Sequence, residues 1–219
     1  MASNVTIPAQ GTGTTTPVIA TREKAGVQYQ TVEIDLGGSG GTYMLQSGVA
    51  TSGGSIPVVG PNDEFVTVSV DVTRPANTTA YAINDCLSDS TSAPTTFTIA
   101  NAAKASGGSG LITDVIVLSD ADPAIPLQGE IFLFDSAVTS PNDNAAFALS
   151  DADARKCIGK VPFVLEDIGN NDFFHAQGLN IGFTCAGTAD LRFLLRVKNT
   201  YTPANGEVST FRFKIQRLT

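Results

Sequence analysis

The sequence predicts an all-β protein, a jelly-roll-like β-sandwich with an extended N-terminal arm. Charged residues make up only 16% of the chain, against about 25% in an average globular domain, and Thr, Ser, Gly, Val and Asn take their place. This composition favours strands and turns, because long exposed helices are built largely from Glu, Lys, Arg and Gln. The 21 glycines and 11 prolines suit many short elements joined by tight turns.

The composition changes near residue 62, where we expect a boundary between an arm, residues 1–62, and a sandwich domain, residues 63–219. The arm holds eleven of the 21 glycines, much Thr and Ser, and few large apolar residues. Strands are expected in it at Val27–Leu36 and Tyr43–Gln46. A segment with so little apolar area cannot bury a core of its own. We therefore expect it to lie on its own C-terminal domain, on a neighbouring subunit or on a larger surface.

The expected sandwich domain contains β-rich segments separated by turns rich in Gly, Pro, Asn and Asp. In Val208–Arg217, apolar residues such as Phe211 and Phe213 alternate with polar ones such as Arg212, and Leu191–Asn199 alternates in the same way. Such alternation is typical of sheets with one buried face and one face in water. About eight strands in roughly 155 residues fit a two-sheet sandwich of the jelly-roll type. The expected strands are Phe65–Thr73, Thr95–Ala100, Leu111–Ser119, Glu130–Phe134, Ile158–Leu165, Leu179–Cys185, Leu191–Asn199 and Val208–Arg217.

One short helix is expected at Ser150–Cys157. Ser150 suits the N-cap, Asp151 the first turn and Arg155 the last turn, because these charges complement the helix dipole. A helix of this length serves as a connector between strands.

The negative net charge disfavours some classes of main binding partner. The net charge is −8 and the lysines and arginines are few and scattered, so neither nucleic acid nor an anionic membrane is expected as the main partner. No run approaches the roughly 20 apolar residues of a membrane span. The N-terminus lacks the basic and apolar regions of a secretory signal, so we expect synthesis in the cytosol. Cys86, Cys157 and Cys185 have no CxxC spacing; reduced thiols are favoured, and one structural pair stays open.

Residues that could support catalysis are scarce. The single histidine, His175, follows an Asn- and Asp-rich stretch that we interpret as a loop, and it has no second histidine to share a metal site. Gly37–Gly41 matches G-x-S-x-G, but no helical pattern follows it, as a nucleophile elbow requires. We therefore expect no catalytic residues, no cofactor and no metal ion.

Two pairs of aspartates need a separate interpretation. Asp120 with Asp122, and Asp151 with Asp153, are interpreted as turn and N-cap residues, with a structural Ca²⁺ between loops as the alternative. A glycan-cleaving β-sandwich enzyme is a further alternative, which two carboxylates converging in a cleft would favour.

Several segments resemble proteins encoded in the structural modules of tailed phages. Those segments are Thr73–Asp85 (TRPANTTAYAIND), Ser92–Phe97 (SAPTTF), Gly107–Ile112 (GGSGLI), Asp143–Asp153 (DNAAFALSDAD), and Val18–Thr21 with Ala25–Val32. They cover most of residues 18–155, and the chain departs from the family pattern at Ile83, Asn84, Cys86 and Leu87. The resemblance implies a capsid decoration (cement) or head protein, often homo-oligomeric, and it brings no catalytic residues.

On this resemblance we expect a structural virion protein, made in the host cytoplasm, that binds the exterior of a tailed-phage capsid and bridges its subunits. The expected partners are the major capsid protein and further copies of this chain, as a trimer or dimer. The apolar arm residues expected to contact the capsid or another partner are Val18, Ile19, Val27, Tyr29 and Val32. The alternative is a tail or head fibre component that binds a host surface receptor or polysaccharide through the sandwich loops.

Overall fold

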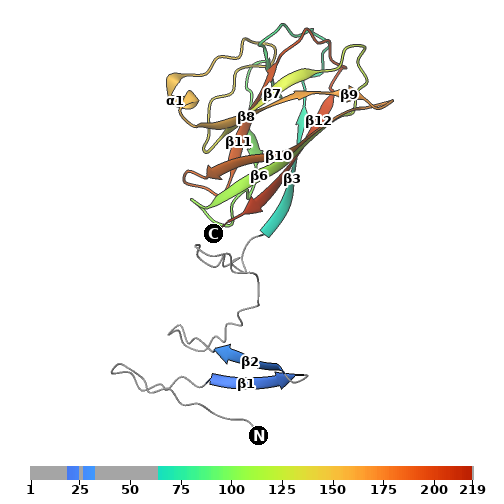
Figure 1. Ribbon diagram of the computed structural model, residues 1–219. Helices are drawn as coiled ribbons and strands as arrows, with labels where there is room; N and C mark the ends of the chain where they lie inside the picture. The colour runs from blue at the N-terminus through green and yellow to red at the C-terminus, as the bar shows by residue number, and fades with distance from the viewer. Residues whose placement is uncertain (1–18, 25–26, 33–63, 219) are drawn as a thin grey trace. The chain divides into compact units, whose positions relative to one another are not determined.

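The computed structural model describes residues 19–24, 27–32 and 64–218. The chain divides into two units, Met1–Ile56 and Pro57–Thr219. In the first unit, β1 (Ile19–Lys24) and β2 (Val27–Val32) pair as an antiparallel hairpin (Figure 1).

The hairpin confirms the first part of one predicted strand. Residues 27–32 of the expected strand Val27–Leu36 form β2, whereas β1 was not predicted. The rest of that strand, the expected strand Tyr43–Gln46 and the expected boundary at residue 62 lie outside the described residues.

The second unit is built from two antiparallel sheets (Figure 1). Sheet 1 runs β3 (Glu64–Thr73), β12 (Val208–Arg217), β6 (Ser109–Ser119), β10 (Asp172–Thr184) and β9 (Glu166–Asp167). Sheet 2 runs β4 (Cys86–Leu87), β11 (Leu191–Val197), β7 (Gln128–Phe134) and β8 (Cys157–Val164), and β5 (Phe97–Ile99) also pairs with β11.

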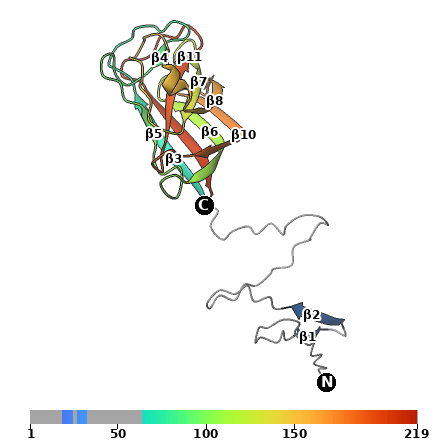
Figure 2. The ribbon, with the colours of Figure 1, turned by 90° about the vertical axis from the view of Figure 1, so that its left-hand side faces the viewer.

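The order of pairing is that of a jelly roll. The first long strand, β3, pairs with the last, β12; next β4 and β5 pair with β11, then β6 with β10, and finally β7 with β8. Successive pairs alternate between the two sheets, as they do when one long antiparallel ribbon is rolled around a core. The predicted all-β, jelly-roll class is therefore confirmed, and Figure 2 shows the two layers turned by 90°.

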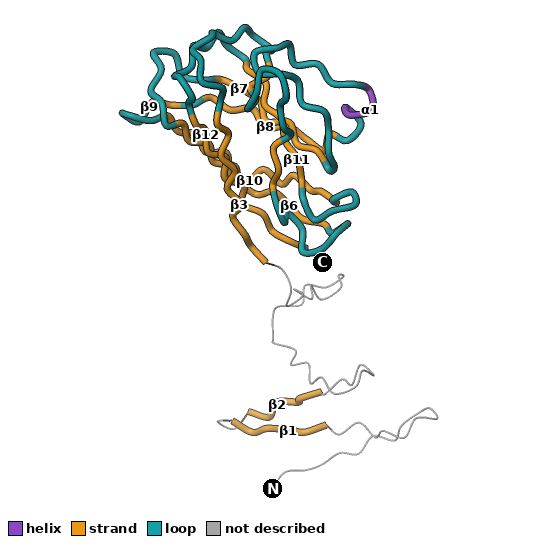
Figure 3. Tube along the Cα trace, turned by 180° about the vertical axis from the view of Figure 1, so that it is seen from behind, coloured by secondary structure: helices purple, strands orange, loops and turns teal. Residues whose placement is uncertain are grey.

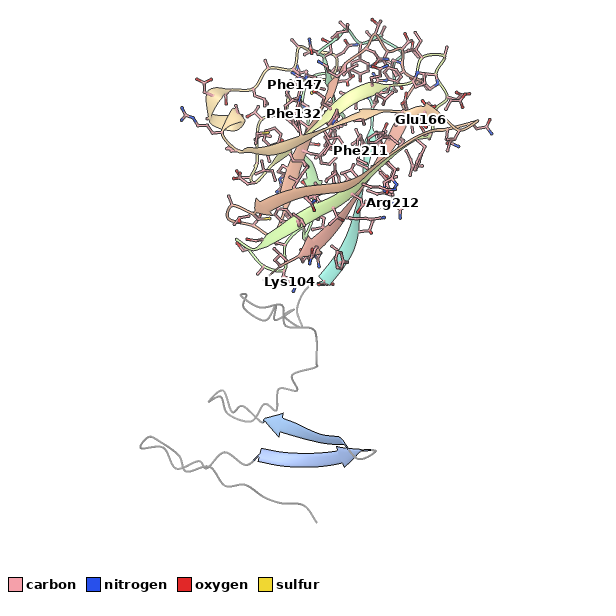
Figure 4. All side chains as sticks on the ribbon, in the orientation of Figure 1. Lys104, Phe132, Phe147, Glu166, Phe211 and Arg212 are labelled. Atoms are coloured by element: carbon pink, nitrogen blue, oxygen red, sulfur yellow. The ribbon has the colours of Figure 1, made fainter. Side chains whose placement is uncertain are left out.

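The core lies between the sheets and is rich in phenylalanine. Phe193 on β11 contacts Phe211 and Phe213 on β12, with ring centroids 5.4 and 5.3 Å apart. Phe211, Phe213 and Ile215 are buried, and Figure 4 shows Phe211 pointing into the sandwich and Arg212 away from it. The alternation predicted for β12 is confirmed, and it supplies the buried face of sheet 1.

Part of the outer face of sheet 2 is covered, so the prediction of a face in water holds only in part for this sheet. The connection between β7 and β8, residues 135–156, packs a second apolar cluster against it, formed by Phe134, Val138 and Leu194. At the edge of that cluster the Phe132 and Phe147 rings lie 4.8 Å apart (Figure 4). The alternation in β11 did not reveal this cover, because Leu194 falls on the face that otherwise carries arginines.

The predicted helix is confirmed but shorter. It forms α1 (Asp151–Ala154), whose N-cap is Ser150: the Asp153 amide donates to Ser150 Oγ at 3.1 Å. The helix ends early because Cys157 begins β8.

Strand β10 is longer than predicted and contains His175, so the interpretation of His175 as a loop residue is wrong. β10 begins at Asp172 rather than Leu179, and its register with β6 shifts between Gln177 and Ile181. Gly178 and Asn180, at φ 66° and 50°, form this bulge. The bulge interrupts the alternation that would have marked one continuous strand. β4 and β9, each two residues long, were also not predicted.

Substitutions on the buried and outer faces of β12 are expected to lower the free energy of unfolding by different amounts. Phe211→Ala should lower the free energy of unfolding by about 3–5 kcal/mol, since it removes a buried ring and leaves a cavity. Arg212→Ala, one residue along on the outer face, should change it by less than about 0.5 kcal/mol. Urea unfolding followed by circular dichroism measures both; equal losses would contradict the assigned faces.

Candidate functional site

The predicted contact residues lie on the hairpin, as far as the structure describes them. Ile19 on β1 is the direct register partner of Val32 on β2, and Val27 and Tyr29 pair with Lys24 and Arg22. The fifth, Val18, lies outside the described residues. The backbone thus brings Ile19 and Val32, thirteen positions apart in sequence, to the same end of one hairpin.

The segments that carry the family resemblance meet in space. Asp85, the last residue of the segment Thr73–Asp85, forms an isolated β-bridge with Ala146 of the segment Asp143–Asp153. The Cys86 amide donates to the Ala145 carbonyl at 2.7 Å, and the Phe147 amide donates to the Asn84 carbonyl at 2.8 Å. Two motifs about 60 residues apart in the sequence therefore form one structural unit at the end of the sandwich.

A buried ion pair lies at the centre of this unit. Arg74 Nη2 is 3.3 Å from Asp143 Oδ2, and each side chain is 1% exposed. The Tyr81 hydroxyl donates to Asp143 Oδ1 at 2.5 Å and accepts a hydrogen bond from Arg74 Nε, and the Ser88 amide also donates to Asp143 Oδ1 at 2.9 Å. A buried charge is tolerated only when it is paired and hydrogen-bonded, and these contacts meet that condition.

A second buried carboxylate, Glu207, lies beside the first. It accepts hydrogen bonds from the Tyr201 hydroxyl, from Ser119 Oγ at 2.8 Å and from the Ala204 amide at 3.1 Å. The two groups are linked, because the Arg74 amide donates to the Glu207 carbonyl at 3.0 Å.

Both tyrosines stay protonated in this environment. Burial, followed by the hydrogen bond to Asp143, raises the pKa of Tyr81 above its ordinary value. Burial and the nearby Glu207 charge raise the pKa of Tyr201 in the same way. Each phenol therefore acts as a permanent hydrogen-bond donor to a carboxylate, which is a structural role.

The two buried cysteines, Cys86 and Cys185, offer no activated thiol. Burial raises the pKa of Cys86 to about 12 and also raises that of Cys185, so both thiols stay protonated and are poor nucleophiles. All three cysteines are free. His175 lies on the outer face of sheet 1, with Nε2 3.4 Å from Asp114 Oδ1.

Of the predicted aspartate pairs, Asp120 and Asp153 make structural hydrogen bonds, whereas Asp122 belongs to a cluster of three carboxylates. Asp120 Oδ1 accepts a hydrogen bond from the Val208 amide at 2.9 Å, and Asp153 contacts the Thr139 amide and Lys156. Asp122 instead converges with Asp167 and Asp172, with one carboxylate oxygen of each within 4.8 Å of the others.

Asp172 does not suit the role of a glycosidase carboxylate. It is 0% exposed, and a general acid or nucleophile must reach its substrate. The sequence did not point to Asp167 or Asp172, because residues in an Asn- and Asp-rich turn are ordinarily exposed and nothing in the local sequence signals the burial of Asp172.

An ion-pair network lies on sheet 2. Glu130 Oε1 is 2.6 Å from Lys160 Nζ, and Glu130 Oε2 pairs with the Arg196 guanidinium. Burial alone would raise the pKa of Glu130, but the hydrogen bonds from Lys160 and Arg196 outweigh it and hold that pKa below its ordinary value.

The described helix is too short to cross a membrane. Within residues 64–218, six large apolar side chains are exposed, and such residues are normal when they are scattered. They are Phe65, Ile83, Ile125, Val164, Ile168 and Leu218.

Comparison with known proteins gives remote similarities only. No protein-family model and no curated protein matches the chain. Solved structures with some similarity include the native virion of Kashmir bee virus at neutral pH, at 11% identity over 97% of this chain and 92% of that chain, with a TM-score of 0.28. Desmodium yellow mottle tymovirus is 12% identical over 82% of this chain and 95% of its own, with a TM-score of 0.28.

The empty head of turnip yellow mosaic virus is 10% identical over 80% of this chain and 90% of its own, with a TM-score of 0.29. Likeness at such TM-scores supports no inference, and the jelly-roll assignment rests on the strand pairing of this chain alone.

Loss of the Asp143 carboxylate, which pairs with Arg74, is expected to destabilise the fold strongly. Asp143→Ala should lower the free energy of unfolding by about 3–5 kcal/mol, because it leaves the Arg74 charge buried without a partner. Tyr81→Phe removes one hydrogen bond and should cost about 1–2 kcal/mol. Asp71→Ala, at an exposed position on β3, is the control and should cost less than about 1 kcal/mol. Chemical denaturation measures all three, and a loss at Asp143 no larger than at Asp71 would contradict the network's role.

The Glu130 network is expected to make stability depend on pH. The folded-state pKa of Glu130 is lowered, so its contribution is complete above the unfolded-state pKa of about 4.3 and is lost as the pH falls through the folded-state value. Glu130→Gln should therefore lower the free energy of unfolding by about 1 kcal/mol at pH 7 and by less at pH 3. The effect is small because Lys160 and Arg196 are partly exposed. Thermal unfolding at both pH values tests this, with Glu166→Gln as the exposed control; a pH-independent difference would contradict it.

Proposed function

We propose that this protein is a structural virion protein that binds the outside of a tailed-phage capsid and stabilises the shell by bridging capsid subunits. The main support for the proposal is the sequence resemblance of several segments to tailed-phage structural proteins. These segments are residues 18–21, 25–32, 73–85, 92–97, 107–112 and 143–153. Its expected location is the exterior of the virion, after synthesis in the host cytoplasm.

The placement of the resembling segments supports a structural role. Arg74, Tyr81 and Asp143 are engaged with one another and buried. They form part of the framework of the sandwich and leave no group directed at a substrate. This favours a protein that binds and assembles over an enzyme.

The arm, residues 1–62, is proposed as the element that contacts the capsid, with the sandwich, residues 63–219, as the displayed body. Ordering an arm poor in apolar residues costs conformational entropy, which a large receiving surface offsets. A capsid lattice provides that surface, and simultaneous attachment of several copies adds avidity. Contacts with the major capsid protein are assigned to Val18, Ile19, Val27, Tyr29 and Val32.

The net charge of −8 agrees with a position on the outer surface, away from packaged DNA. A homotrimer or homodimer is proposed, because bridging several capsid subunits is most direct for an oligomer with matching symmetry. Nucleic acid and membranes are not proposed as partners.

The alternative is a fibre component that binds a host receptor through the sandwich loops. Ile125 and Ile168, 58% and 60% exposed in connections of the second unit, favour a contact surface there. A polysaccharide ligand is less favoured, because the chain has no Trp and two of its four tyrosines, Tyr81 and Tyr201, are fully buried.

Co-sedimentation with undecorated capsids tests the proposal. The full-length protein should bind at a fixed stoichiometry. The double substitution Val27→Ser and Tyr29→Ser should weaken binding at least about tenfold, since each buried apolar side chain contributes about 1.5–3 kcal/mol. The matched control is Gln28→Ser with Gln30→Ser on the same strand.

Two outcomes would decide against parts of the proposal. If the full-length protein does not bind capsids, the decoration role is wrong, and binding to host cells then becomes the measurement for the fibre alternative. If it binds but the Val27/Tyr29 variant binds equally well, the assignment of Val27 and Tyr29 as contact residues is wrong.

A further inference from the structure

Three carboxylates converge where sheet 1 ends. Asp172, the first residue of β10, is the direct register partner of Asp167 on β9 and of Ser119 on β6. Asp122 reaches the same place from the connection between β6 and β7, and one oxygen of each aspartate lies within 4.8 Å of the other two. Figure 3 shows the connecting loops gathered at the end of the sandwich where β9 lies.

Asp172 has no hydrogen-bond partner among the described residues. Both of its carboxylate oxygens are buried and unpaired, and the residue is 0% exposed. The other buried carboxylates nearby differ, because Asp143 and Glu207 each accept hydrogen bonds from several donors. An ionised carboxylate buried without donors is costly, so some further group must satisfy Asp172.

We propose that Asp122, Asp167 and Asp172 bind a Ca²⁺ ion. All the side-chain ligands are carboxylate oxygens, which is the donor set of a hard divalent cation and unlike the His and Cys sets of zinc. Ca²⁺ accepts 6–8 oxygen ligands at about 2.3–2.6 Å in a flexible geometry, whereas Mg²⁺ demands a near-ideal octahedron at about 2.0–2.1 Å. Three carboxylate oxygens within 4.8 Å of one another, two of them on exposed side chains, suit the more flexible ion.

The charge around the cluster favours a cation. Burial raises the pKa of Asp172, and the neighbouring charges of Asp122, Asp167 and Glu207 raise it further. A bound divalent cation would cancel this repulsion, whereas a proton would cancel only one charge. Asp122 and Asp167 are exposed, so an ion has a path from solvent and water can complete its 6–8 oxygen ligands.

The ion would tie the β6–β7 connection, which carries Asp122, to the paired strands β9 and β10, which carry Asp167 and Asp172. Ile125 follows Asp122 by three residues and Ile168 follows Asp167 directly, so the loops that expose these isoleucines would be ordered by the same ion.

Calorimetric titration of the full-length protein with CaCl₂, after removal of metals with EDTA, tests the site. We expect one Ca²⁺ per chain and weaker binding of MgCl₂. At Ca²⁺ concentrations about 100-fold above the dissociation constant, the melting temperature should rise by about 5–10 °C. Asp122→Asn and Asp167→Asn, at exposed positions that leave the core intact, should each weaken Ca²⁺ binding at least about tenfold.

Asp151→Asn is the matched control, an exposed aspartate on α1 outside the cluster, and should bind Ca²⁺ like the unaltered protein. The proposal is overturned if Ca²⁺ produces neither heat nor a rise in melting temperature, if Mg²⁺ binds more tightly than Ca²⁺, or if Asp151→Asn loses as much affinity as Asp122→Asn. If Ca²⁺ does not bind and Asp172→Asn melts at a higher temperature than the unaltered protein, the cluster holds a proton instead.

Discussion

The guanidinium of Arg74 is a buried charge, and one end of the sandwich is organised around satisfying it. Its partners come from three connections that are distant in sequence: Tyr81 after β3, Asp143 between β7 and β8, and the Ala204 carbonyl between β11 and β12. An unpaired buried charge is costly. Each of these connections must therefore adopt its native position if the Arg74 charge is to keep its partners. The ion pair therefore determines how the loops at this end pack, although the strands themselves are held by the apolar core.

A polar row continues from this ion pair across the end of the sandwich. Tyr81 lies next to Tyr201, whose hydroxyl donates to Glu207, and Glu207 accepts from Ser119, the register partner of Asp172. The first part of the row has a donor for each carboxylate. The last part ends at Asp172, which has none among the described residues. Hydrogen bonds therefore satisfy Asp143 and Glu207, whereas a cation is proposed to satisfy Asp172.

The strands were predictable where one face meets the core and the other meets water. That condition holds for β12, whose alternating Phe211 and Phe213 identify the strand and its buried face. It fails for part of the outer face of sheet 2, because the segment that covers this part follows β7 in sequence and packs through Phe147 and Val138, which carry no periodic pattern. It also fails for β10, where a bulge at Gly178 breaks the alternation. The aspartate cluster was unpredictable for a related reason: the register between strands, not the local sequence, places Asp167 opposite Asp172.

The resemblance to tailed-phage proteins says different things at buried and at exposed positions. The residues that carry it between positions 73 and 153 include Arg74, Tyr81 and Asp143, which are buried and bonded to one another. Residues in that position determine how a sandwich end is built, so similarity there transfers the fold more directly than it transfers a partner. Recognition of a partner must instead depend on exposed positions. The proposed function assigns the partner contacts to the part of the resemblance at residues 18–32, which includes β1 and β2.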